Sequence, residues 1–172
     1  LITGMRTRRP AAHNWTENPP SDHQQGGTAV LVTNTLLPCL KSTGTDFRGL
    51  GRWCWALFEG NNGIRPRNIS VYNVGKPKSD LHGSVYQQHV RYIQNHGMLA
   101  NPRKLLRDDL LGQLRTWVRQ GDRIVLTMDA NEHVLNRPLC RELTNPAQGL
   151  DFRGITPEHW GPSEPTTWVH GR

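Results

Sequence analysis

The sequence predicts one domain of the mixed α/β class. Two observations favour this class: short apolar runs rich in β-branched residues, and longer stretches in which apolar residues recur at helical spacing. A third is their order, because strands come first and helices then alternate with strands in the second half of the chain. A chain of 172 residues is long enough for one domain with a real core and too short to suggest two.

The first half of the chain predicts strands and connections. Residues 1–25 are polar and show no periodicity, so we interpret them as an irregular, exposed segment before a domain that spans residues 26–172. Apolar runs typical of strands follow at 28–33, 53–59 and 68–74. Residues 35–51 lack such a pattern and predict a connection. The Gly60-Asn-Asn-Gly63 turn separates the second run from the third, which predicts an antiparallel hairpin.

Two longer helices are predicted after these strands. Ser84 and Gln87 have the spacing of a capping box, and Gly97 is a typical helix stop. Asn101 and Pro102 suit the cap and the first position of the next helix. This second helix carries an apolar stripe made of Leu106, Leu110, Leu114, Trp117 and Val118. Further along, the pattern favours a short helix at 137–143 and a strand at 166–169.

The stretch between Gly121 and His133 suggests the chemistry. Its apolar run, 123–128, is typical of a strand buried on both faces. Asp129 and Asn131 come directly after it, where α/β proteins place functional residues, and residues two apart in an extended chain point the same way. We therefore expect a carboxylate and a carboxamide in one cleft, a pair suited to a hard metal ion and a phosphate oxygen. The spacing equally fits a strand followed by an ordinary polar loop.

Charge, cysteine content and hydropathy indicate which partners and which cellular compartment to expect. Lys and Arg number 21 against 14 Asp and Glu, a net charge of +7, and this basic balance fits a nucleic-acid partner. The three cysteines share no C-x-x-C spacing, which argues against a disulfide scaffold and favours a reducing, intracellular compartment, the nucleus included. No apolar run approaches membrane-spanning length, so we expect no membrane partner. The sequence does not indicate an oligomeric state.

Several motifs occur in an order that resembles a known superfamily. They are Gly26-Gly-Thr-Ala-Val-Leu-Val32, Ile69-Ser-Val-Tyr-Asn-Val74, Gly121-Asp-Arg-Ile-Val-Leu-Thr-Met-Asp-Ala-Asn-Glu132 and Pro165-Thr-Thr-Trp168. The series resembles the endonuclease/exonuclease/phosphatase superfamily, whose fold is DNase I-like. Two further stretches, Gly49-Leu-Gly-Arg-Trp53 and Gly83-Ser-Val-Tyr-Gln-Gln88, resemble its uncharacterised eukaryotic and retroelement-like members. The resemblance implies a two-sheet β-sandwich flanked by helices.

The resemblance also implies an activity and its residues. It implies hydrolysis of phosphodiester bonds in DNA or RNA by a nuclease that depends on Mg²⁺ or Mn²⁺. Asp129 matches the aspartate that orients the attacking water or accepts its proton, and it can ligate the metal. Asn131 matches the asparagine that hydrogen-bonds the scissile phosphate, and Tyr72 matches a tyrosine near that phosphate. His133 follows closely enough to line the cleft, and Met128 replaces the glycine that usually precedes the aspartate.

Other residues of the superfamily's site have no match within this sequence. The resemblance places a metal-binding glutamate before Leu1, and an aspartate and an Asp-His pair after Arg172. We therefore expect the chain to be truncated at both ends, with an incomplete fold and little activity on its own. Two alternatives remain open: a phosphatase or lipid phosphodiesterase of the same fold, and a nucleic-acid-binding module that is a non-catalytic remnant of a retroelement.

Overall fold

The computed structural model describes residues 11–13, 27–75, 84–131 and 138–155, and these form a mixed α/β structure. The strands are β1 (Ala11–His13), β2 (Thr28–Val30), β3 (Leu40–Thr45), β4 (Trp53–Phe58), β5 (Pro66–Tyr72) and β6 (Arg123–Asp129). The α-helices are α1 (Val85–Asn95), α2 (Pro102–Arg119) and α3 (Pro138–Leu143). Three short 3₁₀ helices are η1 (Asn34–Cys39), η2 (Asn61–Gly63) and η3 (Pro146–Gln148).

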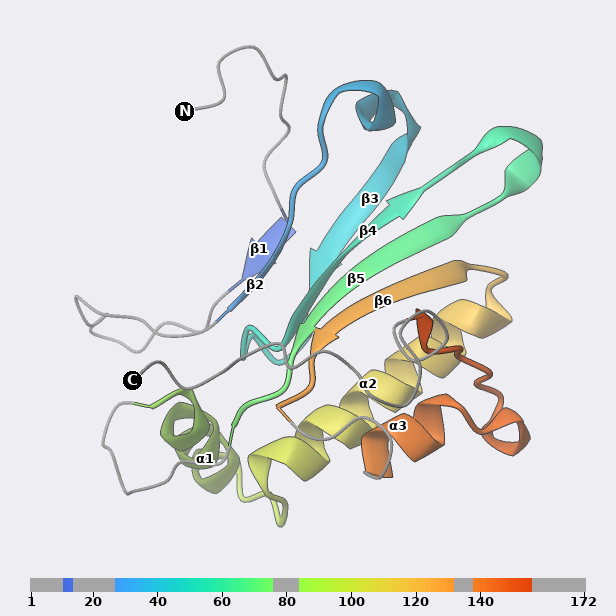
Figure 1. Ribbon diagram of the computed structural model, residues 1–172. Helices are drawn as coiled ribbons and strands as arrows, with labels where there is room; N and C mark the ends of the chain where they lie inside the picture. The colour runs from blue at the N-terminus through green and yellow to red at the C-terminus, as the bar shows by residue number, and fades with distance from the viewer. Residues whose placement is uncertain (1–10, 14–26, 76–83, 132–137, 156–172) are drawn as a thin grey trace, which may run out of the picture.

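Two sheets are present in the described residues. The larger has the strand order β3-β4-β5-β6, and β1 and β2 form a separate antiparallel ribbon. The predicted hairpin is confirmed, because β4 and β5 pair antiparallel on either side of the Gly60–Gly63 turn. β6 instead pairs parallel to β5, as expected when helices connect two strands. Figure 1 shows α2 and α3 on one side of the larger sheet and the β1-β2 ribbon beside β3 and β4.

The helix boundaries follow the predicted capping signals. The Ser84 hydroxyl accepts a hydrogen bond from the Gln87 N–H at 3.3 Å, and Gly97 has a φ of 61° just after α1. At the start of α2, the Asn101 side chain accepts a hydrogen bond from the Lys104 N–H at 2.9 Å. None of the helices within the described ranges is long and apolar enough to cross a membrane.

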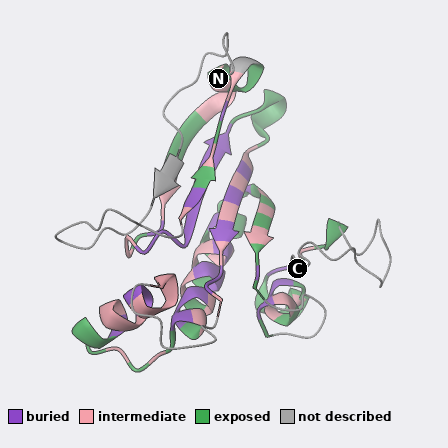
Figure 2. Ribbon diagram, turned by 60° about the vertical axis from the view of Figure 1, so that its left-hand side comes forward, coloured by how far each residue is buried: buried purple, intermediate pink, exposed green. Residues whose placement is uncertain are grey.

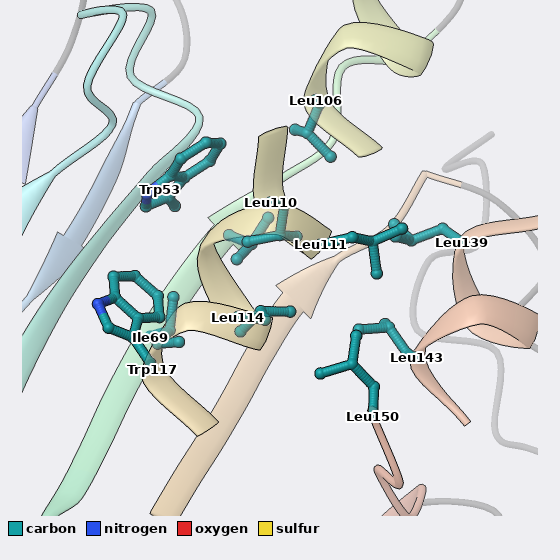
Figure 3. Packing of buried hydrophobic residues seen from close by; sticks show 11 residues of the cluster. Trp53, Ile69, Leu106, Leu110, Leu111, Leu114, Trp117, Leu139, Leu143 and Leu150 are labelled. Carbon is teal, nitrogen blue, oxygen red and sulfur yellow. The ribbon is translucent and has the colours of Figure 1, made fainter. Parts of the chain in front are cut away.

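The main core lies between α2 and the sheet. Side chains from one face of α2 pack against the sheet and α3 (Figure 3), and the cluster comprises Trp53, Ile69, Val71, Leu106, Leu110, Leu111, Leu114, Trp117, Leu139, Leu143 and Leu150. The predicted stripe is therefore confirmed except at Val118, which is 40 % exposed. Val118 lies one residue beyond Trp117, a rotation of about 100° that turns it off the buried face.

Two strands occur where none was predicted. β1 lies inside the N-terminal segment interpreted as irregular, and its Ala11 and Ala12 pair with Val30 and Ala29. β3 lies inside the predicted connection and pairs with β4 at the edge of the larger sheet. Neither segment has the alternation of a half-buried strand, so both become strands by pairing with the next strand along the chain, β1 with β2 and β3 with β4. The predicted strand at 28–33 is shorter, because β2 ends at Val30.

The prediction that the central strand is buried on both faces is wrong. β6 is the last strand of the sheet that the described residues form, and its residues alternate between exposed and half-buried (Figure 2). Ile124, Leu126 and Met128 pack against the main core, whereas Val125 on the opposite face is 50 % exposed. The continuous apolar run suggested burial on both faces because Val125 is as apolar as its neighbours. No described residue covers Val125 fully.

Candidate active site

The candidate site lies where β5 and β6 end side by side. Tyr72 is the last residue of β5, Asp129 is the last residue of β6, and the two are partners in the parallel register. The Asn73 N–H donates a hydrogen bond to the Asp129 carbonyl oxygen at 2.9 Å, which continues the pairing past Tyr72. Register partners in a sheet point to the same face, so the phenol and the carboxylate both lie on the face away from α2.

Asn131 reaches this place by a different route from the one predicted. Its φ of 47° is left-handed, so the strand does not continue through it and the alternation rule does not apply. Its N–H donates to Asp129 Oδ1 at 3.1 Å, and its Nδ2 donates to the Asn73 carbonyl oxygen at 2.6 Å. The aspartate and the asparagine are therefore brought together by a tight turn, with the carboxamide over the end of β5.

Asp129 and Asn131 both affect the pKa of Tyr72. Burial raises the pKa of its hydroxyl above the ordinary value, the negative charge of Asp129 raises it further, and a hydrogen bond with the Asn131 side chain opposes the shift. A tyrosine with an ordinary pKa is already protonated at neutral pH and the upward shift acts in the same direction, so the phenol can donate a hydrogen bond. The three residues that the sequence singled out, Tyr72, Asp129 and Asn131, thus form one group at the end of the sheet.

Two residues that sequence reasoning missed hold this turn. The Ala130 carbonyl oxygen accepts hydrogen bonds from Asn73 Nδ2 at 2.8 Å and from Arg103 Nη2 at 3.3 Å. Arg103 lies in the first turn of α2, and its Nη2 also donates to the Asn131 carbonyl oxygen at 3.3 Å. Asn73 carried a usable signal, because it follows an apolar strand as Asn131 does. Arg103 carried none beyond its position in a basic first turn.

Gly75 lies beside the Asn131 carboxamide. A Cβ atom added to this glycine would lie 3.5 Å from Asn131 Oδ1, an ordinary contact distance. Asp129 and Asn131 are exposed and Tyr72 is half-buried. A groove of about 550 Å³ occurs elsewhere, between α1 and the start of α2, and contains none of the three. Among the described residues, the three side chains therefore lie at the surface at the end of the sheet.

The donor atoms suit a cation only in part. The parts of the chain that the structure describes contain no group of three His, Cys, Asp or Glu side chains placed to hold a metal. Asp129 is exposed and its Oδ1 already accepts the Asn131 N–H, so it can supply one ligand oxygen. Mg²⁺ is commonly bound by one or two carboxylates together with water and substrate phosphate, and a single aspartate fits that pattern.

The remaining predicted residues cannot be placed. His133, the start of the short helix at Arg137 and the predicted strand at 166–169 lie outside the described residues. The described site therefore consists of Tyr72, Asp129 and Asn131, supported by Asn73 and Arg103. Among known proteins, no family model, no curated protein and no solved structure matches this chain.

Proposed function

We propose that this chain carries part of the active site of a divalent-metal-dependent phosphodiesterase, most simply a nuclease acting on DNA or RNA. The observation that carries the proposal is the meeting of Tyr72, Asp129 and Asn131 at the ends of two parallel strands. An acid, an amide and a protonated phenol are groups that phosphodiester hydrolysis uses. The order of motifs that resembles the endonuclease/exonuclease/phosphatase superfamily supports the same reaction class.

Each residue has a role that its surroundings allow. Asp129 is exposed, so its carboxylate can orient a water molecule or accept its proton. Asn131 uses Nδ2 to bind the Asn73 carbonyl oxygen and also donates to the Tyr72 hydroxyl, so a phosphate oxygen would take the place of this hydroxyl as acceptor. Tyr72 supplies a further neutral donor, because a phenol is protonated at neutral pH and lies beside Asp129 in the strand register.

A bound Mg²⁺ or Mn²⁺ would neutralise phosphate charge and polarise the bond to be broken. Asp129 is the described residue that would ligate it. The cation is proposed from the reaction class and from the chemistry of this one carboxylate.

The same proposal extends to the fold. The mixed sheet with helices on one side and the β1-β2 ribbon on the other is compatible with part of a DNase I-like two-sheet sandwich. We propose nucleic acid as the substrate because the chain has a net charge of +7. A non-catalytic nucleic-acid-binding module is the second candidate, favoured by the lack of a three-ligand metal site in the described ranges.

The test compares Asp129→Asn with Asp108→Asn in the full-length protein. Asp108 is an exposed carboxylate on α2 that pairs with Lys104, so its replacement removes the same charge away from the site. We expect Asp129→Asn to lower Mg²⁺-dependent turnover of DNA or RNA by about 10²–10⁴-fold with binding retained. Asp108→Asn should leave turnover unchanged. A parallel panel of inositol phosphates and sphingomyelin tests for a phosphatase or a lipid phosphodiesterase.

Two outcomes would contradict the proposal. If Asp129→Asn hydrolyses every substrate as fast as the unmodified protein, the site has been misidentified. If the full-length protein binds nucleic acid but hydrolyses nothing in Mg²⁺ or Mn²⁺, it is the non-catalytic module.

A further inference from the structure

Asn73 makes a hydrogen bond to each of three successive residues of the site. Its N–H donates to the Asp129 carbonyl oxygen, and its side-chain Nδ2 donates to the Ala130 carbonyl oxygen at 2.8 Å. Its own carbonyl oxygen accepts from Asn131 Nδ2 at 2.6 Å. The whole turn that carries the proposed catalytic aspartate and asparagine is thus bound to this single residue of the neighbouring strand end.

The amide at position 73 is poorly suited to a purely structural role. Asn73 is 2 % exposed, and it continues the buried alternation of Ile69 and Val71 on the α2 side of the sheet. Its Oδ1 is buried and makes no hydrogen bond with any described residue. A buried acceptor without a partner destabilises a fold, and an apolar side chain of the same size would avoid that loss. The hydrogen bond to Ala130 is what the amide adds.

That hydrogen bond acts next to a left-handed part of the backbone. Asn131 adopts a φ of 47°, a conformation that few residues other than glycine and asparagine adopt readily. The Ala130 carbonyl group immediately precedes it, and Asn73 Nδ2 is its nearer donor, since Arg103 Nη2 lies at 3.3 Å. Holding this carbonyl group orients the peptide plane from which Asn131 projects, and so sets the direction of its carboxamide.

We propose that Asn73 is a positioning residue of the site, which aims the Asn131 carboxamide at a phosphodiester without touching the substrate. This inference rests on the proposed function. If the inference is correct, replacing Asn73 weakens phosphodiester binding when Asn131 is intact and has no further effect when Asn131 has already been replaced. A residue that merely stabilised the fold would instead act whether or not Asn131 were present.

A double-mutant cycle on the full 172-residue chain separates these roles. The probe is a thymidine dinucleotide, which carries a single phosphodiester, with Ca²⁺ as the oxygen-binding cation. Its Kd is measured from NMR shifts of the backbone amides. We expect Asn73→Ala and Asn131→Ala each to raise the Kd by about tenfold, a typical effect for residues that orient a site. The double variant should bind no more weakly than Asn131→Ala alone.

A second variant and a control guard against loss of the fold. Asn73→Leu removes both polar atoms at similar volume, and thermal unfolding shows whether it folds. It should match Asn73→Ala in binding. Asn68→Ala, on the same strand but toward its other end, should leave the Kd unchanged.

The outcomes distinguish the two proposals. If Asn131→Ala does not change the Kd, both the proposed function and this inference are overturned. If Asn131→Ala weakens binding but neither Asn73 variant does, or if the effects add in the double variant, only the positioning role is overturned. Unfolding of both Asn73 variants would also overturn it, because it would make Asn73 a structural residue.

Discussion

At the scale of single residues, the site depends on conformations that a strand does not supply. Asp129 is the last residue of β6, and Asn131 turns back by adopting a left-handed φ. Hydrogen bonds to Asn73 and to Asp129 Oδ1 hold it there. The two groups meet because the turn is tight, although the predicted reason for their meeting, a continued strand, is incorrect.

His89 shows how burial sets the charge of a residue. Its side chain lies in the core with 2 % exposure, and its Nε2 is 3.1 Å from the Leu50 carbonyl oxygen. Burial lowers the pKa of the imidazole to about 4, helped by the nearby positive charge of Arg52 and opposed by the Leu50 hydrogen bond and Asp46. The folded protein therefore holds His89 neutral at pH values where an unfolded chain would protonate it.

We predict that His89 makes the protein less stable in acid. The unfolded state binds a proton as the pH falls below about 6.5, whereas the folded state does so only near pH 4. The free energy of unfolding should therefore fall by roughly 3 kcal/mol between these pH values from this residue alone. Urea unfolding at a series of pH values measures this. The control, His89→Gln, keeps a donor for Leu50 and does not titrate, so an equal acid slope in both proteins would contradict the prediction.

At the scale of elements, buried ion pairs join α2 to the β3-β4 hairpin. Arg52 donates to both oxygens of Asp46, from Nε at 2.5 Å and Nη2 at 2.7 Å, and from Nη1 to Asp109 of α2 at 2.8 Å. Arg48 also binds Asp109 through two hydrogen bonds. Burial alone would raise the pKa of Asp46, but the hydrogen bonds and charge of Arg52 outweigh it and the pKa is lowered.

We predict a large loss of stability on breaking this network. Arg52→Ala leaves the Asp46 carboxylate in the core without its main partner, and the free energy of unfolding should fall by about 3–5 kcal/mol. Lys41→Ala breaks an ion pair with Glu59 on the exposed surface and should lower it by about 0–1 kcal/mol. Denaturant unfolding of the two variants compares them. Similar losses would show that burial does not set the strength of the Arg52 pairs.

At the scale of the whole molecule, the proposed nucleic-acid partner depends on charge. The net charge is +7, and Arg103 places one positive group beside Asn131 at the end of the sheet. Arg119 lies at the other end of the same helix, in its last turn. The two arginines, at opposite ends of one helix, allow a test of where on the molecule nucleic acid binds.

We predict that the chain binds DNA with an affinity that falls roughly tenfold or more between about 50 and 200 mM salt, because phosphate contacts release counterions. Arg103→Glu should weaken binding more than Arg119→Glu, since only Arg103 lies at the candidate site. Fluorescence anisotropy with labelled DNA measures both effects. An affinity that does not depend on salt would contradict binding through phosphate contacts. Equal effects of the two variants would show that DNA binds away from the candidate site.

The sequence by itself determined the elements whose signals are local. Ser84, Asn101 and Gly97 mark helix boundaries through hydrogen bonds and conformations within a few residues, and they are found where predicted. The spacing of Leu106, Leu110 and Leu114 identified the buried face of α2 in the same way. The candidate residues Asp129 and Asn131 were recognisable because they directly follow an apolar strand.

Only the tertiary structure decided which distant segments became neighbours. It paired β6 with β5 at the end of the strand order that the described residues form, and buried Arg52 between two aspartates. It also brought Asn73 to the turn at Asn131. The physical reason is that these features depend on pairing and burial between residues separated by many positions, and no local periodicity or capping signal encodes such a partner.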